Sequence, residues 1–142
     1  MAEQVSVFVE NKPGRLTKVT GALAAENINI RALLIQDRGT FGVIKMLVSD
    51  PKKAHLALVK AGFACALREI IAVELADKPG GLHELCKAFL DNNINIIDAY
   101  GFVIEPRKKA IWCVEVENLE KTQNVVEDNG FKVLSECELY EP

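Results

Sequence analysis

The sequence predicts an α+β fold built from two copies of a βαββαβ unit, each a four-stranded antiparallel sheet with both helices on one face. Three observations support this prediction: two short motifs each occur twice, the same strand and helix patterns follow each occurrence, and no Pro/Ser/Gly-rich linker separates the copies. We therefore expect one module over residues 1–68 and a second over residues 69–142.

The internal duplication is the strongest feature of the chain. Residues 12–16 (KPGRL) recur as residues 78–82 (KPGGL), and residues 27–30 (NINI) recur as residues 93–96 (NINI), both displaced by 66 residues. A later Gly-Phe pair recurs at an offset of 68. A longer hairpin loop in the second copy, over residues 105–109, accounts for the drift of two residues. Two motifs at one offset indicate a tandem pair.

The first copy opens with a strand and an amphipathic helix. Residues 5–9 are β-branched or aromatic except for one serine, which favours a strand. Pro13 is expected at the first helical position, where its missing N–H costs nothing. Leu16, Val19 and Leu23 then recur at helical spacing and form one apolar stripe.

A hairpin, a second helix and a last strand complete the first copy. The hairpin is expected over residues 28–48, turning around Arg38 and Gly39. Asp50-Pro51 predicts a helix start, Gly62 its left-handed end, and residues 64–68 the last strand. The second copy follows the same scheme, with an apolar helix stripe of Leu82, Leu85, Cys86, Phe89 and Leu90, strands over residues 70–75, 96–104, 110–116 and 132–140, and helices from Pro79 and Asn118.

One strand of the first copy is apolar on both faces. Val43, Ile44, Met46, Leu47 and Val48 form a nearly continuous run, which is typical of a strand that is buried on both sides. We therefore expect the face of this sheet without helices to pack against another sheet, either in the same chain or in a second subunit. The same reasoning favours a homodimer over a monomer.

The ordered pair of motifs resembles the ACT domain family. An Asn or Asp followed by x-Pro-Gly-x-Leu after a short strand, and then an Asn-Ile-Asn-Ile stretch, occurs in both halves of the chain. The resemblance implies a ferredoxin-like fold for each module and allosteric binding of amino acids. It also implies ligand sites at the interfaces between modules. It implies no cofactor.

The turn between the first strand and first helix is the expected binding site. A helix N-terminus presents free N–H groups and a partial positive charge. Gly14, Gly80 and Gly81 have no side chains, so a ligand carboxylate can approach their amides closely. Asn11 or Asp77 can accept hydrogen bonds from an ammonium group. These groups match the two ends of a free amino acid.

The resemblance adds the start of the second strand as another wall of the site. Tyr100 is a further candidate, since it alternates with Asp98 and Phe102 on one strand face. Copy two is the preferred site, because Asp77 is charged and two glycines leave room, whereas Arg15 partly fills the first copy. The candidate ligand-binding residues are Asn11, Pro13, Gly14, Arg15, Leu16, Asn29, Ile30, Arg31, Asp77, Pro79, Gly80, Gly81, Leu82, Asn95, Ile96, Ile97 and Tyr100.

Structural roles compete with ligand binding at these positions. Asn11 and Asp77 can cap their helices or satisfy the turn, and Pro-Gly can serve only to start it. Asn27 and Asn93 are expected to end their helices, because Asn tolerates left-handed geometry.

Composition and motifs argue against several function classes. The net charge of −3 and a single short basic cluster at Arg107 argue against nucleic acid. The four cysteines lack metal or disulfide spacing, and we expect reduced, buried thiols. His55 and His83 are expected on helices without catalytic partners, and no catalytic, phosphate or metal motif occurs. We expect a cytoplasmic protein with no signal peptide and no membrane span.

The sequence therefore predicts a non-catalytic regulatory protein. We expect it to bind a small ligand, a free amino acid, at the two turns and the module interface, and to signal to a separate metabolic enzyme or transporter. Two alternatives stay open: an interaction module without a small-molecule ligand, and a single-stranded RNA binder. The second alternative needs stacking aromatics on the central strands. The third strands of the two copies, Val43–Val48 and Ile111–Val116, are mainly aliphatic, and Trp112 is their only aromatic residue. The sequence does not identify the amino acid.

Overall fold

The computed structural model describes residues 1–37 and 39–140 and confirms the α+β fold. These residues form seven strands and five helices. The chain divides into two compact units, Glu3–Arg68 and Glu69–Tyr140, the second of which also includes Met1–Ala2. We call them module one and module two.

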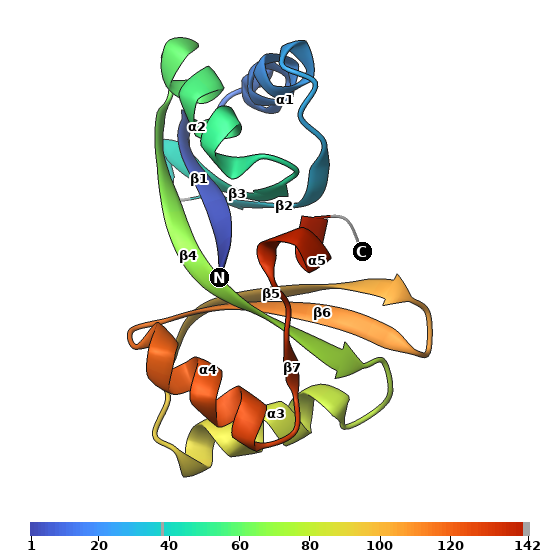
Figure 1. Cartoon of the computed structure of the whole chain (residues 1–142). Coiled ribbons are helices and arrows are strands. Elements are labelled where there is room, and N and C mark those ends of the chain that lie inside the picture. Colours follow the sequence, from blue (N-terminus) through green and yellow to red (C-terminus); the bar gives the residue numbers. More distant parts are fainter. Residues whose placement is uncertain (38, 141–142) are drawn as a thin grey trace. The chain divides into compact units, whose positions relative to one another are not determined.

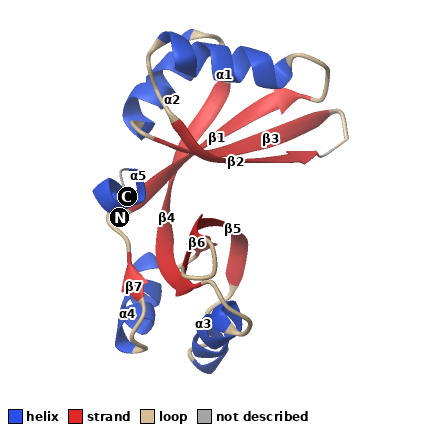
Figure 2. Ribbon diagram, turned by 90° about the vertical axis from the view of Figure 1, so that its right-hand side faces the viewer, coloured by secondary structure: helices blue, strands red, loops and turns tan. Residues whose placement is uncertain are grey.

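Module one is a four-stranded sheet with two helices on one face, as Figure 2 shows. Its strand order is β2-β3-β1-β4, and β3 pairs antiparallel with both β1 and β2. The predicted hairpin joins β2 to β3; Arg38 in its turn lies outside the described residues. The elements are β1 (Ala2–Glu10), α1 (Arg15–Ala25), β2 (Ile30–Asp37), β3 (Phe41–Val48), α2 (Pro51–Lys60) and β4 (Ala64–Ala76).

Alternating strand residues and the helix stripes build the core of module one. Val5, Val7 and Val9 point to the helix side of β1, and Val19 and Leu23 of α1 cover them. Burial of each such side chain stabilises the fold by about 1.5–3 kcal/mol. The predicted stripe of α1 is therefore the face that the module buries.

Module two repeats this architecture, and Figure 1 shows its helices α3 and α4 on one face of its sheet. Its strand order is β4-β6-β5, and β7 pairs with β4. Residues 64–76 form one continuous strand, not the two strands that the sequence predicted. The remaining elements are α3 (Gly81–Asp91), β5 (Ile96–Glu105), β6 (Lys109–Val116), α4 (Leu119–Asp128), β7 (Lys132–Val133) and α5 (Glu136–Tyr140).

The predicted stripe of α3 is only partly buried. Leu85 and Phe89 lie in the core of module two, against Ile71 and Val73 of β4. Leu82 and Leu90, by contrast, are 43% and 78% exposed. Helical periodicity thus identified the buried face of α3 correctly. It also assigned Leu82 and Leu90 to that face, whereas only the residues in its centre pack against the sheet.

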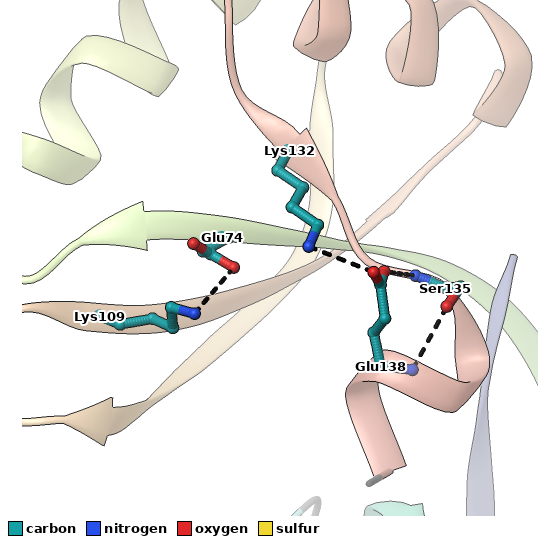
Figure 3. Close-up of polar contacts among 5 residues, drawn as sticks. All are labelled: Glu74, Lys109, Lys132, Ser135 and Glu138. Atoms are coloured by element: carbon teal, nitrogen blue, oxygen red, sulfur yellow. Dashed lines mark hydrogen bonds and ion pairs between the residues drawn. The ribbon is translucent and has the colours of Figure 1, made fainter. Parts of the chain in front are cut away.

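The predicted last strand over residues 132–140 is wrong. Strand β7 holds only Lys132 and Val133, and the chain then turns into α5. The Ser135 N–H donates to Glu138 Oε2 at 2.9 Å, and the Glu138 N–H donates to Ser135 Oγ at 3.3 Å (Figure 3). This reciprocal pair is a capping box, which starts a helix where the scheme of the first copy predicted a strand. The Ser135 N–H, and then Lys132 at 3.2 Å, lower the pKa of Glu138.

The first helix of each module begins later than predicted. Pro13 and Pro79 lie in the turns, and the N-cap residues are Gly14 and Gly80. Gly62, by contrast, has φ +93° after α2, which confirms the predicted left-handed end. Asn27 and Asn93 have φ values of 57° and 55°, so both also adopt the expected left-handed geometry after α1 and α3.

The described part of the chain contains no helix with the length and apolar character needed to cross a bilayer. The prediction that the open face of the first sheet packs against another sheet concerns contacts beyond a single module, and it stays a prediction.

The N-cap of α2 gives a test of local stability. The Asp50 side chain accepts a hydrogen bond from the Lys53 N–H at 3.0 Å, and Pro51 follows at the first helical position. We expect Asp50→Ala to lower the free energy of unfolding by about 1 kcal/mol, measured by denaturant titration with far-UV circular dichroism. Asp50→Asn keeps an acceptor and should cost much less. Equal losses in both variants would contradict a capping role.

Candidate functional site

The two strand–helix turns share an unusual backbone conformation. Gly14 and Gly80 have φ values of 87° and 83°, a region that side chains disfavour. Neither glycine has a side chain to cap its helix, and no side-chain cap occurs at α1 or α3 among the described residues. The helices α2 and α4 differ, since Asp50 and Asn118 cap them.

This difference leaves polar groups available at the turns. Among the first amides of α1, the Arg15 N–H donates to Lys12 O and the Lys18 N–H donates to Gly14 O; in α3, Gly81 and Glu84 make the equivalent bonds. The amides between them, at the second and third helical positions, have no side-chain acceptor and contribute to the partial positive charge of the helix end. Each turn is therefore suited to hold a negatively charged group.

The residues expected to receive an ammonium group have another partner. The Asn11 Nδ2 donates to Gly39 O at 3.1 Å, and Asp77 Oδ2 accepts from the Arg107 N–H at 2.7 Å. Both side chains thus tie their turn to the neighbouring hairpin loop and do not cap a helix. Asp77 uses one of its two carboxylate oxygens in this bond.

In module one, Arg15 fills the space beside the turn. Its Nη2 lies 2.8 Å from Asp37 Oδ1, and its side chain is only 15% exposed. A Cβ placed on Gly42 would lie 3.0 Å from Arg15 Nη1, so the guanidinium rests directly on this glycine. Nη1 is buried with no acceptor among the described residues. Arg15 thus fills the space between the turn and the β2–β3 hairpin. A separate cavity of about 430 Å³ lies beside the same turn toward residues 61–64, and Arg15 and Lys12 form part of its lining.

In module two, a cavity of about 240 Å³ lies beside the turn. Its polar residues are Asp77 and Lys78 at one end, and Trp112 forms part of its wall. The ring of Trp112 also lies 6.1 Å, centroid to centroid, from Phe89 in the core. The remaining lining residues are Leu75, Ala76, Leu82, Gly101, Phe102, Val103, Ala110 and Ile111.

The start of the second strand lies at the other end of each module. Ile30 pairs with Val48 at the end of β3, whereas the turn follows Glu10, which pairs with Phe41 at its beginning. The 11 residues of α1 separate the two ends, a length of about 16 Å. Within a module, the two predicted walls therefore do not form one pocket. The same separation applies to Asn95, Ile96 and Ile97 in module two.

Asn95 lines a different cavity, at this far end of module two. The cavity has a volume of about 330 Å³ and includes Asn93, Asn118 and Lys121. The corresponding part of module one is bridged by hydrogen bonds: the Asn29 N–H donates to Ser49 Oγ, and Lys53 Nζ donates to Glu26 O.

Tyr100 lies away from the turn. It pairs with Cys113 on the sheet face opposite the core residue Val114, and Tyr140 of α5 is close to it. Burial is the main cause that raises the pKa of Tyr100 above its usual value. Burial also raises the pKa of the Cys113 thiol to about 12.

Sequence reasoning missed most of the cavity beside the second turn. Gly101, Val103, Ala110 and Trp112 lie on the β5–β6 hairpin, about 20–30 residues after the turn motif. The one available signal was Trp112, the single tryptophan of the chain. The described residues contain no group of three or more His, Cys, Asp or Glu side chains that could hold a metal ion.

Two βαββαβ modules, each with a first helix that starts at a left-handed glycine without a side-chain cap, define a tandem ferredoxin-like protein. The chain belongs to the ACT domain pair family, whose family model matches residues 1–141. The family resemblance noted in the sequence is thereby confirmed, and ACT domains are regulatory modules.

Solved structures show the same fold. Protein BT0572 from Bacteroides thetaiotaomicron is 33% identical, with a TM-score of 0.93 over 99% of this chain and 96% of that chain. The regulatory subunits of aspartate kinase from Thermus thermophilus and Thermus flavus are 19% and 20% identical, with TM-scores of 0.65 and 0.59. They cover 90% and 89% of this chain, and 92% and 91% of their own. The search among curated proteins gave no match.

The left-handed glycine of the second turn can be tested against a helical one. We expect Gly80→Ala to lower the free energy of unfolding by about 1–2 kcal/mol, because its φ of 83° disfavours a side chain. Gly21 lies in α1, and a Cβ there would meet nothing within 4 Å. Gly21→Ala should therefore raise the same free energy by about 0.5–1 kcal/mol. Denaturant titration would measure both, and an unchanged Gly80→Ala protein would contradict a strained bend.

Thiol labelling tests the burial of the cysteines. Cys113 is buried, but Cys137 is exposed, so the expectation of buried thiols fails for Cys137. We expect iodoacetamide at mildly alkaline pH to label Cys137 quickly and Cys113 only after unfolding, as mass spectrometry would show. The neutral Cys113 thiol favours the folded state below its ordinary pKa, and this contribution declines as the pH rises toward about 12. Equal labelling rates in the native protein would contradict the burial.

Proposed function

We propose that this ACT domain pair is a regulatory protein that binds a free amino acid at a strand–helix turn and acts on a separate enzyme or transporter. The observation that carries this proposal is the contrast between helix starts. Side chains cap α2 and α4, whereas left-handed glycines precede α1 and α3. A ligand carboxylate supplies the acceptor that the chain itself does not provide.

The affinity that such a site supports is moderate. Each charge-assisted hydrogen bond contributes about 1.5–3 kcal/mol. Two or three of them, less the cost of association, correspond to dissociation constants of about micromolar to millimolar. This range suits a sensor that follows the concentration of a metabolite.

Signalling in this proposal requires a second protein or a second copy of the chain. A ligand that binds one assembly more tightly than another shifts the population toward it. A homodimer, or a complex with a metabolic enzyme, would provide the two states. The modules themselves are proposed to be non-catalytic.

An interaction module without a small-molecule ligand is the second candidate function. One observation favours it: the Asn11 and Asp77 side chains already bond to Gly39 O and to the Arg107 N–H. A ligand ammonium group would have to use the other oxygen of Asp77 or displace Arg107.

A melting-temperature screen against the twenty amino acids tests the proposal. We expect at least one amino acid to raise the melting temperature in a concentration-dependent way. Asp77→Ala and Gly80→Val should abolish the shift, and Asp77→Asn should weaken it, because the amide keeps an acceptor for Arg107 but loses the charge.

The controls separate ligand binding from folding. Each variant is compared with the wild-type protein in the absence of ligand, since loss of the Arg107 bond lowers the melting temperature by itself. A shift that survives both Asp77→Ala and Gly80→Val would show that the ligand binds elsewhere. No shift with any amino acid would favour the interaction module.

A further inference from the structure

We propose that only module two holds the amino acid, and that its cavity accepts an apolar side chain, because the Arg15–Asp37 ion pair occupies the same place in module one. This inference rests on the proposed function. It adds the number of sites and the class of ligand.

The strand pairing shows which positions of the two modules correspond. Asp37 pairs with Gly42 across the β2–β3 hairpin, and Val103 pairs with Ala110 across the β5–β6 hairpin. Gly42 also pairs with Val9 of β1, just as Ala110 pairs with Leu75 of β4. Each of these module-two positions follows its counterpart by 66 or 68 residues, the offsets of the sequence duplication.

In module one, the side chains of Arg15 and Asp37 fill the corresponding space, and the cavity of about 430 Å³ in this module lies elsewhere, toward residues 61–64. Arg15 extends from the first turn of α1 over the hairpin, and its Nη2 contacts Asp37 Oδ1 at 2.8 Å. Gly42 makes room, since a Cβ there would lie 3.0 Å from Nη1 and 3.2 Å from Asp37 Oδ1. In module one, the Arg15 side chain, with its apolar stem and charged end, therefore lies where a ligand would otherwise bind.

In module two, the positions of Arg15, Asp37 and Gly42 are taken by Gly81, Val103 and Ala110. Module two therefore lacks both the arginine side chain and the carboxylate that pairs with it. Gly81 also packs closely in the bend, where a Cβ would collide with the carbonyl oxygen of Ala76. A larger residue at position 81 therefore cannot enter without moving the turn. The resulting cavity of about 240 Å³ stands open.

The lining of this cavity indicates the class of ligand. Leu75, Val103, Ala110 and Trp112 surround it with apolar surface, and Asp77 and Lys78 supply its charges at the end next to the turn. A polar side chain placed against this surface would lose its hydration without a partner. The volume is below the ~300–1,000 Å³ of typical drug-sized sites. An amino acid with a branched or aromatic side chain fits both observations.

Trp112 allows binding in this cavity to be observed directly. It is the only tryptophan of the chain, so its fluorescence reports on module two alone. We would titrate the wild-type protein with L-leucine, L-isoleucine, L-valine and L-phenylalanine, and with L-serine, L-aspartate and L-lysine as polar probes. Calorimetry would count the ligands. We expect an apolar amino acid to bind once per chain and to change the Trp112 emission.

Two variants test the cavity and its occupied counterpart. Ala110→Leu should reduce the affinity by about tenfold or more, because the added methyl groups fill the cavity, while Ala24→Leu on the exposed face of α1 should not. Arg15→Gly combined with Asp37→Val gives module one the residues of module two at two of the three positions and removes the ion pair. We expect this variant to bind a second ligand without a second change in fluorescence.

The outcomes separate this inference from the proposed function. Binding of polar amino acids alone, two ligands per wild-type chain, or binding that leaves Trp112 emission unchanged would overturn the inference and leave the amino-acid sensor intact. No binding of any of the twenty amino acids would overturn both. Circular dichroism of each variant shows whether it folds; if Ala110→Leu does not, the wild-type ligand profile and the Arg15→Gly/Asp37→Val variant still decide.

Discussion

The left-handed glycine before the first helix of each module is the constraint on which the site depends. With φ values of 87° and 83°, Gly14 and Gly80 turn the chain from strand to helix in a way that side chains disfavour. A glycine at this position has no side chain to cap the helix, so the backbone conformation and the unsatisfied amides have a single cause. The capped starts of α2 and α4 show that the same chain caps helices where no such bend is needed.

Duplication has produced two turns whose glycines have similar φ values, 87° and 83°, but whose surroundings differ. The hydrogen bonds that fix the bend are shared: Asn11 and Asp77 both reach their neighbouring hairpin loop. The space between the bend and the following hairpin differs, because Arg15 and Asp37 occupy it in module one, whereas Gly81 and Val103 leave it free in module two. A few differences at corresponding positions are therefore enough to give one module a filled turn and the other a candidate binding site.

The sequence predicted the elements well where the pattern was local and strong. The Asp50-Pro51 cap, the left-handed Gly62 and the left-handed Asn27 and Asn93 each follow from residue types with a strong conformational preference. The last strand failed for a local reason as well, since the Ser135–Glu138 capping box was present but the scheme of the first copy was extended over it. The helix starts shifted because Pro-Gly places the glycine, and not the proline, at the N-cap.

By itself, the sequence determined the fold class, the duplication and the position of both turns, because these depend on periodicity and on backbone preferences of neighbouring residues. Only the tertiary structure decided which residues surround each turn. Trp112 and Ala110 reach the second turn through antiparallel pairing with strands β5 and β4, and the start of the second strand lies a helix length away. Such neighbours are set by strand register and packing, which link residues far apart in the chain and leave no local pattern to read.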